Sequence, residues 1–180
     1  MATPTREQRF EGLFREHYGA VRGYALRRAA TEAAQDVVAE TFLVAWRRLD
    51  EVPDDALPWL YGVARRVLAN QRRSASRGAA LERRLAGAET AASPADPSET
   101  AGDSELMRLA LSRLPDSSRE ALMLVAWHGL TAARAARAAG CSRATFAVRL
   151  HRARARLAAQ LAALESAAAP NLEQRSLEVG

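Results

Sequence analysis

The chain has 180 residues, of which 48% are hydrophobic and 26% charged, so it can form one or two small domains and is too polar for a membrane protein. Much of the hydrophobic content is alanine and only 6% of the residues are aromatic, which favours helices and predicts an all-α fold. The formal net charge is +5, and all 26 basic residues are arginines, whose guanidinium groups suit phosphates and carboxylates.

Residues 6–77 are predicted to form a first helical domain. Its first helix is indicated by an apolar stripe at helical spacing, which consists of Phe10, Leu13, Phe14, His17 and Val21. The second helix is expected to run from Thr31, as its N-cap, to Leu49, and its apolar core-facing side is predicted to consist of Val38, Phe42, Ala45 and Leu49. The third is expected to begin after residues 54–55, with Pro58 in its first turn.

The second helix carries a row of acidic residues on one face. Glu32, Asp36 and Glu40 are spaced four residues apart, and each such pair of like charges destabilises an isolated helix by about 0.2–0.5 kcal/mol. The helix dipole favours Glu32 near the N-terminus, but it does not favour Glu40, which lies more than two turns into the helix. The row is therefore not explained by the stability of the helix.

The sequence changes character after the first domain. Between residues 74 and 104 it is rich in Ala, Gly, Ser and Pro and nearly lacks large apolar side chains, so residues 78–103 are predicted to be a linker. A second helical domain is expected over residues 104–165, followed by a disordered tail at 166–180. The predicted fold is thus two small helical domains joined by a flexible linker.

The second domain is predicted to contain a helix-turn-helix. Thr131 is expected to cap a short helix, the chain turns at Gly140, and Ser142 is expected to cap a long final helix. Ala136 is a small residue where two helices would cross, and Phe146 is an apolar anchor inside the second of them. Gly140 supplies the positive φ that such a turn requires.

Arginines dominate this second domain. Seven of them lie between residues 121 and 164, a segment without any Asp or Glu. A helix-turn-helix reads base edges with the first turns of its second helix, while nearby arginines hold phosphates. Arg143 and Thr145 are therefore predicted to contact base edges, and three further arginines are predicted to contact phosphates: Arg149, Arg152 and Arg154. An ordinary solvated helix face is the alternative interpretation.

Aromatic and basic residues follow one another early in the predicted third helix. Trp59 and Tyr61 precede Arg65 and Arg66. Packing in the core is the simpler interpretation of the two aromatic residues, but aromatic rings among arginines can also hold an unstacked single strand of nucleic acid. The residues alone leave both interpretations open.

The sequence offers no motif for catalysis, a cofactor or a metal. It lacks a phosphate-binding glycine-rich loop and a Gly-x-Ser-x-Gly motif, and its three histidines have no carboxylate or cysteine at ligand spacing. Cys141 is the single cysteine, which excludes an internal disulfide. We therefore expect a protein that is not an enzyme and needs neither cofactor nor metal. Without a signal peptide or an apolar run that could span a bilayer, it is expected in the cytoplasm, with no insertion into the membrane.

Four segments resemble the two conserved domains of bacterial extracytoplasmic-function (ECF) sigma factors, a subfamily of the sigma-70 family. Residues 36–46 (DVVAETFLVAW) and 58–65 (PWLYGVAR) resemble the first conserved domain. Residues 114–122 (LPDSSREAL) and 145–154 (TFAVRLHRAR) resemble the second. All four occur in the expected order, with a linker between the domains, and this ordered set is far more specific than any one motif.

The resemblance implies a sigma factor that binds core RNA polymerase and directs promoter recognition and DNA melting. The acidic helix would dock on the clamp coiled coil of the β′ subunit through Asp36, Glu40, Phe42 and Leu43. The third helix and the loop before it would open the minus-ten element and capture a flipped base, with contacts from Trp59, Tyr61, Arg65, Arg66, Asn70 and Arg73. The second domain would rest on the β flap and read the minus-thirty-five element through Ser142, Arg143, Thr145, Arg149, Arg152 and Arg154. The family also admits an anti-sigma protein as a partner.

The sequence departs from the family pattern at several positions. Arg66 and Asn70 stand where many members carry Asn and Asp, and Arg134 and Arg137 stand where an acidic residue and an isoleucine are common. The promoter sequence therefore cannot be transferred from relatives. The alternative function is a stand-alone, dimeric helix-turn-helix repressor or activator, and an enzyme with a DNA-binding appendage is a third. The first domain is the weakness of the regulator, and only the general size of that domain favours the enzyme.

Overall fold

The computed structural model describes residues 4–86 and 103–177, and every regular element within these ranges is a helix. The helices form two compact units, one built on α1 to α3 and the other on α4 to α7. The predicted all-α fold, with a helix-turn-helix in the second unit, is confirmed. No helix in the described part of the chain combines the length and apolarity needed to cross a membrane.

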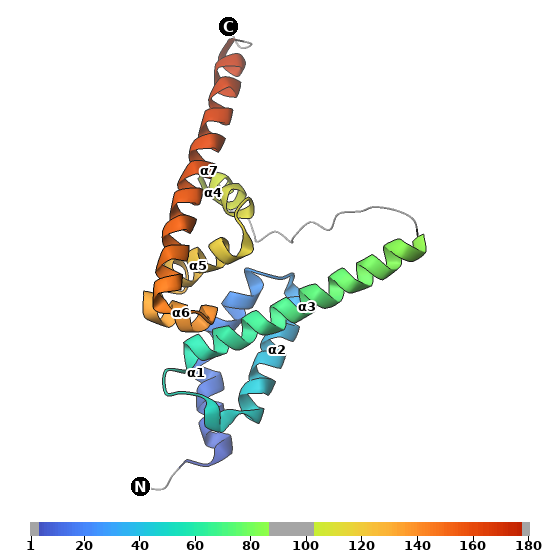
Figure 1. Cartoon of the computed structure of the whole chain (residues 1–180), viewed down its shortest axis with the longest axis vertical. Helices are drawn as coiled ribbons and strands as arrows, with labels where there is room; N and C mark the ends of the chain where they lie inside the picture. Colours follow the sequence, from blue (N-terminus) through green and yellow to red (C-terminus); the bar gives the residue numbers. More distant parts are fainter. Residues whose placement is uncertain (1–3, 87–102, 178–180) are drawn as a thin grey trace. The chain divides into compact units, whose positions relative to one another are not determined.

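In the first unit, α1 (Arg6–Leu26), α2 (Thr31–Arg47) and α3 (Ala56–Ala86) pack against one another, as the blue to green ribbons of Figure 1 show. A short 3₁₀ helix, η1 (Leu49–Glu51), lies between α2 and α3. A capping box begins α1, because the Thr5 hydroxyl accepts the backbone N–H of residue 8 and the side chain of that glutamine accepts the N–H of Thr5.

Aromatic side chains form much of the core of this unit. The rings of Tyr24 and Tyr61 stack with their centroids 4.8 Å apart, and both residues are buried. Phe42 is 4% exposed and lies 4.7 Å from Phe14, ring centroid to ring centroid. The predicted inward face of α2 is confirmed, since Val38, Phe42 and Ala45 are all buried.

Both ends of α2 differ from the prediction. Ala30 rather than Thr31 is the N-cap, because the carbonyl of Ala30 already accepts the N–H of Ala34. The helix ends at Arg47, because Arg48 leaves the helical region with φ −115° and ψ 32°. Leu49 is buried as predicted, but it lies in η1.

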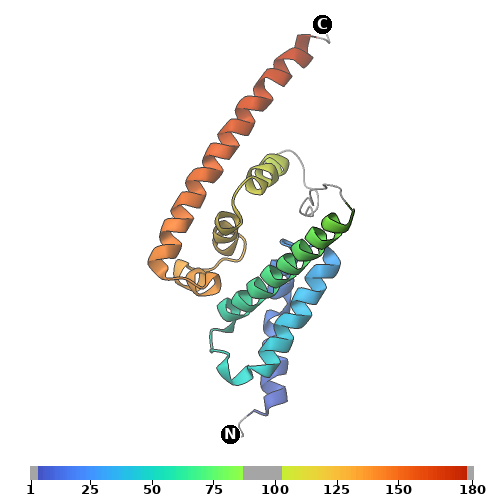
Figure 2. The ribbon, with the colours of Figure 1, turned by 45° about the vertical axis from the view of Figure 1, so that its right-hand side comes forward.

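The second unit contains α4 (Asp103–Ser112), α5 (Asp116–Ala126), α6 (Ala132–Ala139) and α7 (Arg143–Leu177). Figure 2 shows α4 and α5 beside the first half of α7, and both helices pack against it.

The predicted turn and caps of the helix-turn-helix are confirmed. Gly140 has φ +66°, and the N–H of Cys141 donates to the carbonyl of Ala136, which closes the end of α6. The Thr131 hydroxyl accepts an N–H in the first turn of α6, and Ser142 caps α7 in the same way. Phe146 is fully buried and anchors α7 in the core of the unit.

Two helices are longer than the sequence predicted. α3 continues to Ala86, into the region assigned to the linker, and α7 continues to Leu177, into the region assigned to a disordered tail. The extension of α3 is rich in Ala, Leu, Glu and Arg, which favour a helix even where no apolar stripe packs on a core. The extension of α7 is also rich in alanine, but it continues through Pro170, which disfavours a helix interior. The rest of the predicted linker, at 87–102, and the last predicted tail residues, at 178–180, lie outside the described residues.

Candidate DNA-binding and partner-binding surfaces

The first turn of α7 is held by its cap. The Ser142 Oγ accepts the backbone N–H of Thr145 at 3.1 Å, and the two hydroxyl oxygens lie 2.8 Å apart. Ser142, Arg143 and Thr145 are all exposed. The structure therefore brings these three predicted residues together at the start of the helix, and it ties the Thr145 hydroxyl to the cap.

The outward face of α7 also contains a residue that was not predicted. Val148 is 51% exposed, although it is a large apolar side chain. It follows Thr145 by three residues and precedes Arg152 by four, so helical spacing alone puts all three on one face. The thymine methyl group is the apolar feature that such a side chain can contact in the major groove.

The arginines of α7 divide into two kinds. Four arginines of this helix are predicted to contact DNA: Arg143, Arg149, Arg152 and Arg154. These four side chains make no hydrogen bond or ion pair with any of the described residues. All of these are exposed except Arg149, which is half-buried. The Nη1 of Arg156, by contrast, donates to the buried Ser118 Oγ at 3.1 Å and so links α7 to α5. Arg156 thus has a structural contact, whereas the other four are available to an anion.

The outward face of α2 matches the predicted acidic surface in part. Asp36 and Glu40 are exposed, and neither takes part in a hydrogen bond or ion pair with the described residues. Leu43 is 40% exposed and continues the same side of the helix. Phe42 is buried against Phe14 and packs beneath this surface, so its contact with a partner stays a prediction.

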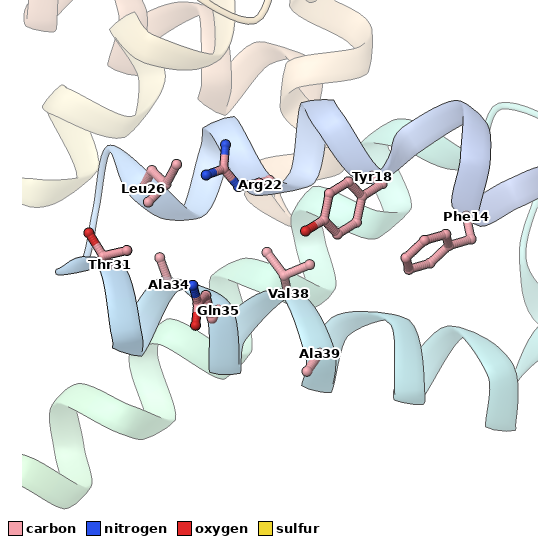
Figure 3. A pocket seen from close by; sticks show the side chains of 9 residues that line it. All are labelled: Phe14, Tyr18, Arg22, Leu26, Thr31, Ala34, Gln35, Val38 and Ala39. Atoms are coloured by element: carbon pink, nitrogen blue, oxygen red, sulfur yellow. The ribbon is translucent and has the colours of Figure 1, made fainter.

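A groove lies between α1 and α2, next to the acidic surface. It has a volume of about 240 Å³ and is drawn in Figure 3. The Phe14 and Tyr18 rings line it from α1, and Ala34 and Val38 line it from α2. Phe14 and Tyr18 are 39% and 40% exposed, which the sequence did not indicate because their spacing matches that of a buried stripe. An apolar surface therefore borders the unpaired carboxylates of α2.

The six residues predicted to act at the minus-ten element divide between two sides of α3. The positions of Trp59, Arg66, Asn70 and Arg73 repeat at intervals of seven, four and three, so these residues form one row along the helix. Arg66, Asn70 and Arg73 are exposed, and a guanidinium nitrogen of Arg73 donates to Asn70 Oδ1. Trp59 is half-buried, with the Arg48 guanidinium 5.9 Å from its ring centroid.

Tyr61 and Arg65 are outside this row. Tyr61 is 2% exposed and its ring is stacked on Tyr24, so it lies in the core of the unit, and its contact with DNA stays a prediction. Arg65 follows it by one turn on the same side and is half-buried. Within the described residues, no group of three or more His, Cys, Asp or Glu side chains could hold a metal ion.

Both units match models of known protein families. Sigma-70 region 2 matches residues 13–78, and Sigma-70, region 4 matches residues 104–157. The ECF RNA polymerase sigma factor SigL of Mycobacterium tuberculosis is 33% identical over 144 residues, which cover 77% of this chain and 81% of SigL. This chain belongs to the ECF sigma factors. A sigma factor directs promoter recognition at transcription initiation, and the alternative of a stand-alone repressor or activator is not favoured.

Other relatives agree with this ECF sigma factor assignment. EcfG of Rhodopseudomonas palustris is 34% identical over 133 residues, which cover 72% of each chain. The sigma factor RpoE of Bartonella quintana, solved with the anti-sigma factor NepR, superposes with a TM-score of 0.66 at 26% identity, over 84% of this chain and 96% of RpoE. CnrH, solved with the cytosolic domain of CnrY, superposes with a TM-score of 0.57 at 25% identity, over 86% and 88%.

Proposed function

We propose that this sigma factor is a non-enzymatic, dissociable subunit of core RNA polymerase that acts in the cytoplasm. The observation that carries the proposal is the correspondence between the two sigma-70 regions and the two compact helical units. Residues 6–77 would form the unit for polymerase docking and the minus-ten element, and residues 104–165 the unit for the minus-thirty-five element. Residues 78–103 would connect the two functions.

The start of α7 is the proposed reader of the minus-thirty-five element. Support comes from the exposed first turn, the unpaired arginines along the helix and the helix-turn-helix geometry. Arg143 and Thr145 would contact base edges, while Arg149, Arg152 and Arg154 would neutralise phosphates, and Ser142 would fix the first turn.

The exposed row of α3 is the proposed surface for the minus-ten element. Support comes from one face that presents a tryptophan followed by two arginines and an asparagine, which suits a single strand with splayed bases. The loop at residues 48–55, which leads into α3, would form the pocket for a flipped base. Arg65 would lie at the edge of this surface.

The acidic face of α2 is the proposed docking site for core polymerase. Asp36 and Glu40 are fully available to cations, and Leu43 adds apolar area beside them. A basic surface of the β′ clamp coiled coil would neutralise the carboxylates, while the second unit would rest on the β flap. Because the superposable sigma factor RpoE was solved with the anti-sigma factor NepR, an anti-sigma protein is also a proposed partner of this chain.

The test is co-purification with core polymerase, followed by transcription from a promoter library randomised at both elements. We expect a stable complex and transcripts enriched for one sequence at each element. The protein alone should yield no enrichment when the same library is used for binding. Specific binding of the free protein, without any complex with core polymerase, would instead support a stand-alone regulator.

A further inference from the structure

The loop at residues 48–55 is held in place by the first helix of the same unit. Both α2 and α3 pack on α1, so the N-terminal turns of α1 lie near the point where α2 ends and η1 begins. The buried side chains of Leu49 and Val52 anchor the loop from below. Its polar groups are contacted from α1 by two arginines, Arg6 and Arg9.

Arg6 makes three contacts with the start of the loop. Its Nη2 donates to the carbonyl of Trp46 at 2.8 Å, and its Nη1 donates to Oδ2 of Asp50 at 3.4 Å. The guanidinium also lies 5.2 Å from the centroid of the Trp46 ring. One side chain thus fixes the last turn of α2 and the first acidic residue of the loop.

Arg9 fixes the other end of η1. Its Nη2 donates to the carbonyl of Val52 at 3.2 Å, and its Nη1 lies 3.8 Å from Oδ1 of Asp50. Asp50 therefore receives one arginine at each of its carboxylate oxygens. Because the Asp50 side chain is 81% exposed, these ion pairs add little to the stability of the fold.

The opposite side of the loop is tied to α3. Arg48 pairs with Glu51, whose Oε1 accepts the Arg48 Nε at 3.0 Å, and the Arg48 guanidinium lies near the ring of Trp59. This hydrogen bond lowers the pKa of the Glu51 carboxyl and raises the pKa of Arg48. The loop is thus braced between α1 and the first turn of the proposed minus-ten surface.

We propose that Arg6 and Arg9 are positioning residues that set the geometry of loop 48–55 and so determine the discrimination among minus-ten sequences. Neither side chain needs to touch DNA. Each acts through the carbonyls of Trp46 and Val52 and through Asp50, which fix where the loop lies relative to Trp59. The inference rests on the proposed role of this loop in capturing a base.

The test compares the double variant Arg6→Ala/Arg9→Ala with wild type, as holoenzyme, on promoters that share one upstream element and differ at the minus-ten element. Open-complex formation is measured by permanganate reactivity of unpaired thymines. The ratio between preferred and non-preferred sequences should fall about fivefold or more, which equals about 1 kcal/mol and is the net effect of one typical hydrogen bond. Affinity for core polymerase and preference at the upstream element should not change.

Two further variants make the result specific. Arg15→Ala removes an arginine of α1 whose one ion-pair partner among residues 4–86 and 103–177 is Glu11, one turn earlier in the same helix, and it should leave minus-ten discrimination unchanged. Arg6→Lys/Arg9→Lys keeps both charges but loses the forked donors, and it should fall between wild type and the alanine variant. If the alanine variant does not fold, the comparison between the lysine variant and wild type tests the proposal.

The outcomes are distinct. If wild-type holoenzyme opens promoters with clear minus-ten preference and both double variants keep it, Arg6 and Arg9 do not position the loop. If wild-type holoenzyme forms but shows no minus-ten preference, the proposed role of the loop itself is wrong. In the free protein, the alanine variant should also exchange the amide hydrogens of residues 49–52 faster than wild type, with no change in the middle of α1.

Discussion

At the residue scale, position along α7 separates two kinds of arginine. Arg143 lies in the first turn, directly after the Ser142 cap, where a recognition helix is deepest in the groove. Arg149 and Arg152 lie about 1.7 and 2.5 turns further along, where phosphates are the nearer target. The same side chain is therefore expected to serve specificity at one position and affinity at the others.

Arg143→Ala should change which upstream element is preferred. A bidentate contact between arginine and a guanine edge contributes about 1–3 kcal/mol of discrimination, and this variant would lose it. Arg149→Ala should instead weaken all promoters alike and reduce the slope of log affinity against log salt by about one unit. The measurement is holoenzyme binding to a panel of upstream-element variants across a salt titration. Equal shifts in preferred sequence for both variants would contradict this placement of α7.

Val148 gives a second prediction at this scale. Its exposed side chain lies among residues expected to face bases, so we expect an apolar contact with a thymine methyl group. Replacing single thymines of the upstream element by uracil removes only that methyl, and at one position it should weaken binding by wild-type holoenzyme. With Val148→Ala the same replacement should have no effect. A uracil penalty that persists in the variant would assign the contact to another side chain.

At the element scale, the sequence predicted which faces of the helices are buried better than where the helices end. Val38 and Ala45 could be assigned to the core because the apolar residues of a buried helix face recur at the same spacing, and this spacing does not depend on what the helix packs against. The starts of α6 and α7 were also predictable, because Thr131 and Ser142 cap their helices through local hydrogen bonds. The ends of α3 and α7 could not be predicted, since an alanine-rich segment can form a helix without showing a periodic apolar pattern in the sequence.

The candidate sites show why a sequence motif alone mixes surface and core residues. Trp59 and Tyr61 belong to the same motif, but Tyr61 meets Tyr24 of α1, which lies far away in the sequence, and is buried by that contact. Phe42 is adjacent to the exposed Leu43, and it is buried because its ring packs on Phe14. No local signal specifies such tertiary partners.

The acidic face of α2 yields a prediction for the whole helix. Asp36→Arg together with Glu40→Arg should abolish binding to core polymerase, because it reverses the charge of the proposed docking surface. The fold should be retained, since both side chains are exposed and unpaired among the described residues, and the pair with Glu32 becomes a pair of opposite charges. Pull-down with core polymerase and circular dichroism measure the two effects.

The matched control reverses two acids with the same spacing on α1. Glu7→Arg with Glu11→Arg changes the net charge equally and lies on another helix, so binding to polymerase should persist. Wild-type affinity of the α2 variant, with an unchanged dichroism spectrum, would contradict the docking assignment. Loss of binding in both variants would indicate that overall charge matters more than the α2 face.

At the scale of the whole molecule, recognition is divided between two compact units. Each unit carries one small proposed DNA-binding surface, and the sequence between the units has the composition of a flexible linker. The free protein should therefore gain little from binding both promoter elements at once. We expect the free protein to bind promoter duplex weakly at physiological salt, and the holoenzyme to bind it tightly. Fluorescence anisotropy with labelled promoter measures both. Tight, specific binding by the free protein would contradict this division.

The tryptophans are distributed so that the unmodified protein can report on its own surfaces. Trp46 and Trp59 lie half-buried in the first unit, whereas Trp127, at the end of α5, is 44% exposed. A collisional quencher such as acrylamide should therefore reach the indole of Trp127 most readily, and Trp127 should emit at longer wavelength than the other two. Replacing Trp127 with phenylalanine would leave tryptophan emission from the first unit alone. Any blue shift of that emission on adding single-stranded minus-ten DNA would then report on the first unit, without a chemical label.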